Sequence, residues 1–132
     1  MNVDMGNSQL NNIWIIDTTL RDGEQSPGVN LASEERINIA KMLAGAGVDE
    51  LEAGIPAMGP HARKGLSEIN RMGLSSRITG WCRAMKSDIG AAEQCGLSSV
   101  HISFPVSDRQ LNAFGKDKTW VLNCIEELLP FA

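Results

Sequence analysis

The sequence predicts an α/β fold made of four successive βα units. Short apolar runs alternate along the chain with helical patterns, and glycines stand where the helical patterns end. Repeated strand–helix–strand connections are right-handed and give a parallel sheet. The pattern alone fits both a doubly wound open sheet and part of a closed eight-stranded barrel.

The predicted strands are short. The first is a nearly continuous apolar run, IWIID, which is typical of a strand covered on both faces. The second alternates between apolar and polar residues. A polar stretch before the first strand, residues 1–12, is predicted to be a flexible tail, so the domain spans residues 13–132. The four strands are predicted at residues 13–17, 48–55, 77–82 and 100–104.

Four helices are predicted between and after these strands. Ser33 is a good N-cap for the first helix and Ser87 for the third, because a hydroxyl oxygen accepts a hydrogen bond from a free backbone N–H group. Glycine is the preferred residue just past a helix end. The predicted stops are Gly45 with Gly47, then Gly73 and Gly96, and the last helix carries Val121, Ile125, Leu128 and Leu129.

Composition excludes several classes of function. The 132 residues carry a net charge of −4, from 16 acidic and 12 basic side chains, so no basic stripe for nucleic acid is expected. There is no secretory signal and no run of about 20 apolar residues, so we expect a cytoplasmic protein without a membrane partner. Three cysteines without a C-x-x-C pair are expected to be buried, reduced thiols.

The most informative segment is DTTLRDGEQSPGV, residues 17–29, at the carboxyl end of the first strand. In parallel α/β folds the chemistry lies at these strand ends. Charged side chains there are costly to bury unless they bind something. The alternative is a solvated loop in which Arg21 and Asp22 pair for only ~0–1 kcal/mol.

The run LRDGEQ, residues 20–25, resembles the signature of the DRE-TIM metallolyases, aldolase-like acyltransferases that include isopropylmalate, citramalate and homocitrate synthases. The likeness continues through residues 50–59 (ELEAGIPAMG), 75–84 (SSRITGWCRA) and 101–108 (HISFPVSD). These later segments are most similar to homocitrate synthases of nitrogen-fixing bacteria. The resemblance implies a pyruvate carboxyltransferase-like domain that forms roughly the first half of a TIM (β/α)₈ barrel.

The resemblance also implies roles for individual residues. Asp22 would be a ligand of a divalent metal, Mg²⁺ or Mn²⁺ with Zn²⁺ as a further candidate. The metal would hold a 2-oxo acid and polarise its carbonyl for attack by acetyl-CoA, the co-substrate. Arg21 would supply positive charge where negative oxygen develops, and Gln25 would hydrogen bond within the same site.

Substrate recognition is implied for three further residues. Arg83 is similar to the arginine that grips the distal carboxylate of 2-oxoglutarate, although spacing alone fits a surface arginine. Glu52 would face the substrate, and Ser103 is a weaker candidate for a polar contact. The implied reaction is homocitrate synthesis, with isopropylmalate or citramalate synthesis as the alternative.

The histidines and tryptophans receive no metal or cofactor role. Neither His61 nor His101 has a second histidine two residues away, so neither forms the His-x-His pair of the family's metal site. We expect His101 to be a hydrogen-bonded core residue and His61 to lie on the surface at a helix start. The tryptophans are expected to be core or interface aromatics.

The resemblance implies strands five to eight and the His-x-His pair, which lie outside these 132 residues. We therefore expect an inactive isolated chain that needs a second chain carrying those strands. Self-association is the other way to cover an open half-barrel. A truncated remnant and a non-catalytic half-barrel binding module are further alternatives.

Overall fold

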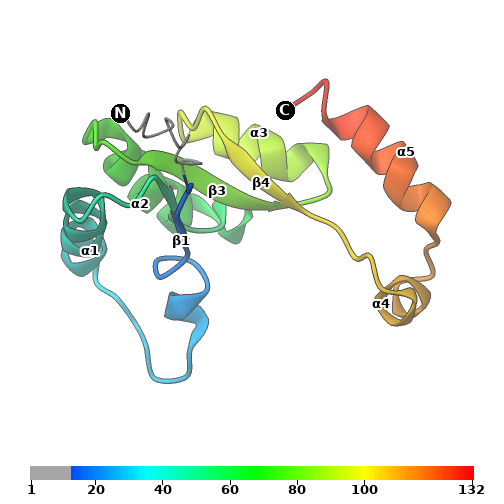
Figure 1. Ribbon diagram of the computed structural model, residues 1–132, viewed down its shortest axis with the longest axis horizontal. Coiled ribbons are helices and arrows are strands. Elements are labelled where there is room, and N and C mark those ends of the chain that lie inside the picture. The colour runs from blue at the N-terminus through cyan, green and yellow to red at the C-terminus, as the bar shows by residue number, and fades with distance from the viewer. Residues whose placement is uncertain (1–12) are drawn as a thin grey trace, which may run out of the picture.

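A computed structural model describes residues 13–132, and the predicted tail lies outside the described residues. Its four strands form one parallel sheet in chain order, which confirms the α/β prediction and is consistent with the first half of a TIM barrel (Figure 1). The strands are β1 (Ile16–Asp17), β2 (Glu50–Glu52), β3 (Arg77–Arg83) and β4 (Val100–Ser103).

Three helices connect these strands, α1 (Ser33–Gly45), α2 (Pro60–Arg71) and α3 (Lys86–Gln94). Two more, α4 (Asp108–Ala113) and α5 (Lys118–Leu128), follow β4 and lie beyond it at one end of the molecule (Figure 1). The sequence analysis predicted α5 but missed α4. Two 3₁₀ turns, η1 (Gly23–Gln25) and η2 (Pro56–Met58), follow β1 and β2.

The glycines predicted the helix ends correctly, whereas the serines did not predict the helix starts. Gly47, Gly73 and Gly96 have φ angles of 86°, 62° and 75°, a conformation that favours glycine, so these predicted stops are confirmed. Both predicted caps are wrong. Ser33 is already the first residue of α1, and the cap is Ala32, whose N–H donates to Glu35 Oε2 at 2.7 Å. Ser87 lies inside α3.

The hydrophobic core lies between the sheet and helices α1 to α3. Side chains alternate between the two faces of a strand, so Leu51 and Ile78 point to the helices while Glu52 and Thr79 point to the other face. Burying a leucine or isoleucine contributes about 1.5–3 kcal/mol. The sheet therefore has one apolar face covered by helices and one polar face. Helix residues in the core are Ala40, Leu66 and Ile69, and Cys95, just after the end of α3, joins them.

Strand β1 differs from its prediction. Its apolar run is not covered on both faces, because Ile13 is 82% exposed and Trp14, Ile15 and Ile16 are each about half exposed. Among residues 13–132, β1 pairs only with β2, so the other edge of β1 has no strand partner there. An exposed apolar strand at an open sheet edge favours pairing with further β-structure.

Candidate active site

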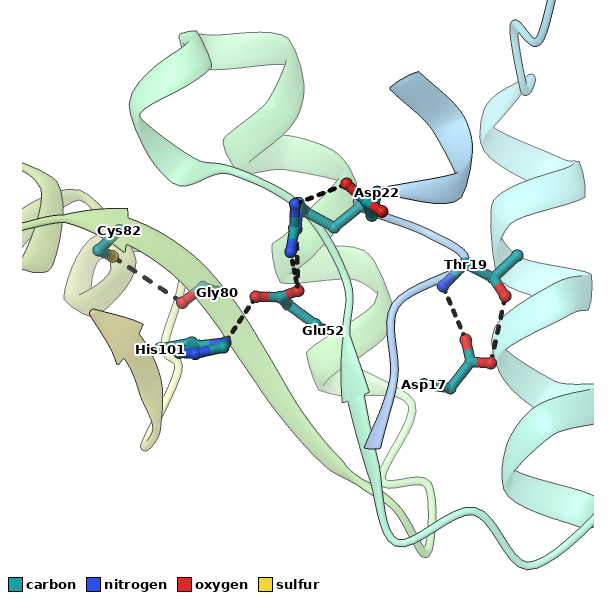
Figure 2. A network of polar contacts seen from close by, with 8 residues as sticks. Asp17, Thr19, Asp22, Glu52, Gly80, Cys82 and His101 are labelled. Atoms are coloured by element: carbon teal, nitrogen blue, oxygen red, sulfur yellow. Dashed lines mark hydrogen bonds and ion pairs between the residues drawn. The ribbon is translucent and has the colours of Figure 1, made fainter. Parts of the chain in front are cut away.

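Side chains from β2, β3 and β4 and from the turn after β1 converge on the open face of the sheet. Arg21 follows β1, Glu52 ends β2, and Trp81 on β3 lies opposite His101 on β4 in the parallel register. Figure 2 shows Glu52 and His101 pointing toward one another across the intervening strand. Residues more than 30 positions apart therefore meet because neighbouring parallel strands end at the same edge.

Glu52 is the centre of this cluster. Its carboxylate is only 1% exposed, and Oε2 lies 2.8 Å from both Nε and Nη2 of Arg21. Its other oxygen, Oε1, lies 2.8 Å from Nδ1 of His101. The Arg21 guanidinium also lies 5.8 Å from the centre of the Trp81 ring. A buried carboxylate needs partners for both oxygens, and Arg21 and His101 provide them.

His101 is the site residue that the sequence analysis missed. The prediction of a hydrogen bond is confirmed, but the prediction of a core position is wrong, since the side chain is 56% exposed. The ring points to the open face and not toward the helices. Strand alternation could have predicted this position, because His101 lies two residues before Ser103, a predicted site residue, and their side chains point to the same face of β4.

Asp22 lies beside Arg21 on an exposed turn. Its Oδ1 accepts a hydrogen bond from Nη1 of Arg21 at 3.0 Å (Figure 2). The turn is held by the carbonyl of Thr18, which accepts the N–H groups of Arg21, Asp22 and Gly23 at 3.1, 2.8 and 3.2 Å. Gln25 is exposed in η1, and together with Arg21 it lines a cavity of about 300 Å³.

Arg83 is held by an acidic partner at the start of α3. Its Nε lies 2.8 Å from Oδ2 of Asp88 and its Nη2 lies 2.9 Å from Oδ1, while its backbone N–H donates to Oδ2 at 3.1 Å. The buried Asp88 carboxyl has a lowered pKa, chiefly because the Arg83 guanidinium hydrogen bonds it. Within residues 13–132, Asp88 uses the edge formed by Nε and Nη2, so the Nη1 end still offers donors.

Arg83 and Ser103 come together at one cavity. It measures about 430 Å³ and opens on the polar face of the sheet beside α4 and α5. Trp81 lines this cavity and also lies against Arg21, so the Arg21 cluster and the Arg83 cavity adjoin. Aromatic side chains supply the apolar wall, among them Phe104, Phe114 and Trp120.

The HMGL-like family model matches residues 12–132, almost the entire chain. The chain belongs to the HMGL-like family. Among curated relatives of this HMGL-like chain, homocitrate synthase subunit alpha of Clostridium pasteurianum is 43% identical over 91% of the chain. Homocitrate synthase of Frankia alni is 46% identical over 87%, and 2-isopropylmalate synthase 2 of Caldanaerobacter subterraneus is 41% identical over 91%.

The HMGL-like chain spans less than half the length of these relatives. The matched region covers 45% of the Clostridium protein, 34% of the Frankia protein and 32% of the Caldanaerobacter protein. The resemblance to homocitrate synthases is confirmed by these matches. They support a synthase of the acyltransferase type.

The residues of this HMGL-like chain fit part of a metal site. Asp22 offers an exposed carboxylate, whose Oδ2 has no hydrogen-bond partner among residues 13–132, and such an oxygen suits Mg²⁺ or Mn²⁺. Within the same residues, no three His, Cys, Asp or Glu side chains gather where they could hold an ion. Asp22 thus fits as one ligand of such an ion, and residues 13–132 do not supply a complete ligand set.

Other predictions can be compared with the same structure. Cys82 and Cys95 are buried free thiols as expected, whereas Cys124 is only partly buried. His61 is exposed at the start of α2, as expected. Trp14 is half exposed and donates from Nε1 to Glu50 Oε2 at 3.0 Å. In the described part of the chain, no helix has both the length and the apolar character of a membrane span.

Proposed function

We propose that this chain forms the part of a homocitrate synthase that binds the 2-oxo acid. A homocitrate synthase joins acetyl-CoA to 2-oxoglutarate. The observation that carries the proposal is the placement of two guanidinium groups, Arg21 and Arg83, on the same open sheet face with Trp81 between them. A dicarboxylic 2-oxo acid has negative charge at both ends, so two separated cations match it. The homocitrate synthases among the relatives support this choice of substrate.

The reacting end of the substrate would lie at Arg21 and Asp22. Glu52 holds the Arg21 guanidinium in one orientation, so its positive charge is already in place when an alkoxide develops from the carbonyl. A divalent metal on Asp22 would polarise that carbonyl when bound. Gln25, exposed beside Arg21, would donate an amide hydrogen bond to the same substrate end.

The distal carboxylate would lie at Arg83. Because Asp88 occupies the Nε edge, the free Nη1 end can receive a second carboxylate, with the Ser103 hydroxyl at the same cavity. The aromatic walls suit the methylene groups of the substrate. A branched apolar 2-oxo acid would leave Arg83 facing a hydrocarbon chain, which is unfavourable for a charged group.

The remaining groups would come from polypeptide beyond residues 13–132. The exposed edge of β1 and the incomplete ligand set of Asp22 support a second segment that carries strands five to eight. In the net reaction the acetyl methyl carbon loses a proton and bonds to the 2-oxo carbon, whose oxygen gains a proton. Water then cleaves the thioester and releases CoA.

The test combines this chain with a complementary chain that carries strands five to eight and measures CoA release. We expect activity with 2-oxoglutarate, its loss in Asp22→Ala, and a drop of about 100-fold in kcat/KM for Arg83→Ala, the effect of losing a charged bidentate contact. Arg71→Ala, an exposed arginine on α2, is the matched control and should leave the rate unchanged. Full activity of Asp22→Ala would refute the proposal.

A second candidate is isopropylmalate synthesis, supported by the Caldanaerobacter relative. The same assay with 2-oxoisovalerate separates the two. For an isopropylmalate synthase, Arg83→Ala would leave the rate with 2-oxoisovalerate intact, and 2-oxoglutarate would be a poor substrate from the outset. A half-barrel binding module would instead sediment as a dimer and release no CoA with any 2-oxo acid.

A further inference from the structure

Arg36 on α1 reaches into the base of the proposed site. Its side chain is only 15% exposed, although arginine is seldom buried without partners. Nη2 donates to the carbonyl oxygens of Ala53 at 2.6 Å and Leu20 at 3.3 Å. Nη1 forms an ion pair with Glu24 in η1. One guanidinium therefore contacts the segment after β1 at two points and the segment after β2 at a third.

These three contacts bracket the residues that the proposed function uses. Leu20 immediately precedes Arg21, and Glu24 comes two residues after Asp22, so the Arg21–Asp22 pair lies between two anchored positions. Ala53 immediately follows Glu52, the carboxylate that holds Arg21. Arg36 thus links the backbones on both sides of the Arg21–Glu52 ion pair, and it does not itself line the cavity of Arg21 and Gln25.

The surrounding chain leaves room for this guanidinium. A Cβ atom on Gly54 would lie 3.3 Å from Nη2 of Arg36, and one on Gly65 would lie 4.0 Å from its Nε. Gly54 also has a φ of 149°, which side-chain-bearing residues rarely adopt. A side chain on Gly54 would therefore crowd the Arg36 guanidinium, whereas the distance at Gly65 is an ordinary van der Waals contact. Lysine has no planar fork and cannot reproduce contacts with three acceptors in fixed directions.

We infer that Arg36 is a positioning residue that fixes the Arg21–Asp22 turn relative to Glu52. The inference rests on the proposed function for its catalytic consequence, but the geometric part stands on the contacts alone. Without the Arg36 fork, the turn keeps its internal hydrogen bonds, among them those to the Thr18 and Thr19 carbonyls, and the Arg21–Glu52 ion pair to β2. It loses its backbone anchors at Leu20 and Ala53 and the ion pair of Glu24. Asp22 would then sample positions away from the one that suits a shared metal, and metal affinity would fall with the rate.

The test compares Arg36→Lys and Glu24→Gln with Arg63→Lys, a matched control. Arg63 is a partly buried arginine on α2 that donates one hydrogen bond, at 3.4 Å, to the carbonyl of Pro56. Amide hydrogen exchange is measured by mass spectrometry on the full chain in the form in which it purifies. Mn²⁺ affinity, kcat and KM are measured on the assembly with the complementary chain.

For Arg36→Lys we expect amide exchange in residues 18–26 to become at least tenfold faster, the factor that corresponds to losing one charge-assisted hydrogen bond. The amides of β3 should keep their exchange rates. Glu24→Gln should give a smaller change in the same residues, and Arg63→Lys none. In the assembly, Arg36→Lys should weaken Mn²⁺ binding and lower kcat about tenfold with an unchanged KM for acetyl-CoA.

Several results would overturn the inference. Unchanged exchange in residues 18–26 for both Arg36→Lys and Glu24→Gln refutes the geometric part, whatever the enzyme does. If Arg36→Lys speeds amide exchange throughout the chain, the Glu24→Gln variant becomes the deciding measurement. A change in exchange that Glu24→Gln spreads evenly over the chain, or no change at all, rejects a positioning role for Arg36. An assembly that releases no CoA rejects the proposed function, yet the exchange result still stands or falls by itself.

Discussion

Replacing Glu52 by glutamine tests whether the buried charge, and not its hydrogen bonds alone, holds the strand ends together. A glutamine has the same shape, so its amide oxygen can still accept from Arg21 and its amide nitrogen can donate to His101 in the matching tautomer. What disappears is the negative charge opposite the guanidinium. Arg21 then keeps only the exposed Asp22 as an anionic partner among the described residues.

The size of the effect follows from the contacts. Two hydrogen bonds between ionised groups, of about 2 kcal/mol each, become bonds from the guanidinium to a neutral amide oxygen, of about 1 kcal/mol each, so Glu52→Gln should cost about 2 kcal/mol. Removing the whole Glu52 side chain leaves the partly buried Arg21 guanidinium without this partner, which has a larger desolvation penalty. Glu52→Ala should therefore lower the free energy of unfolding by about 4 kcal/mol. For the described residues, 13–132, the unfolding entropy is about 0.25 kcal/mol per kelvin, so the melting temperature should fall by about 8 and 16 °C.

Differential scanning calorimetry of the purified protein measures these shifts. Glu68→Gln is the matched control, because Glu68 forms an i,i+4 pair with Lys64 on the surface of α2 at 3.9 Å. Such a pair contributes about 0.5 kcal/mol or less, so the control should move the melting temperature by at most about 2 °C. A melting temperature for Glu52→Gln within 2 °C of the parent protein would refute the reasoning about the buried charge.

Three further predictions concern the packing around β3. Because Arg83 lowers the pKa of Asp88, that carboxylate stabilises the fold above its unfolded pKa of about 3.9, and the contribution is lost as the pH falls through the lower folded value. Thermal melts of Asp88→Asn and the parent should therefore differ at pH 7 and begin to converge as the pH falls below about 4. Burial raises the pKa of the Cys82 thiol to about 11, so mass spectrometry after iodoacetamide treatment at pH 8 should show Cys124 alkylated well before Cys82. Gly80→Ala places a Cβ 2.9 Å from Pro56 Cγ and from a Leu97 methyl, and urea titration should show about 1–3 kcal/mol of destabilisation.

Each of these predictions has an outcome that would contradict it. An Asp88→Asn difference that persists unchanged at pH 3 would mean that the Arg83 pair is not its source. Equal alkylation rates for Cys82 and Cys124 would show that the β3 thiol is accessible. A Gly80→Ala protein as stable as the parent would mean that the sheet and η2 have spare room at this position.

Local sequence signals predicted the fold well where one residue controls the backbone. Gly47, Gly73 and Gly96 end helices because each adopts a left-handed conformation that other residues resist. Serine caps were less reliable, since α1 and α3 begin one and two residues earlier than caps at Ser33 and Ser87 would place them. At α1, the N–H of Ala32, the observed cap, donates to Glu35 Oε2. The short helix α4 was missed, although Ser107 caps it with a side-chain bond from the Gln110 N–H at 3.2 Å.

Contacts between distant residues were beyond the sequence pattern. The approach of His101 to Glu52 depends on the register of strands separated by β3, which apolar alternation does not fix. The pairing of Arg83 with Asp88 was also unforeseen, because both the surface and the substrate-binding interpretations of Arg83 ignored its own helix. For β1, the apolar run correctly indicated a strand, but burial depends on what packs against it.

The strand order of the sheet affects how such a protein folds during synthesis and how its gene can be extended or divided. Since β1 to β4 lie side by side in the order in which they are synthesised, each new unit adds to an existing edge and disturbs no pair already made. A polypeptide with this topology can fold progressively from its first unit, and it can be extended, duplicated or divided between genes at a unit boundary without any segment having to thread through another.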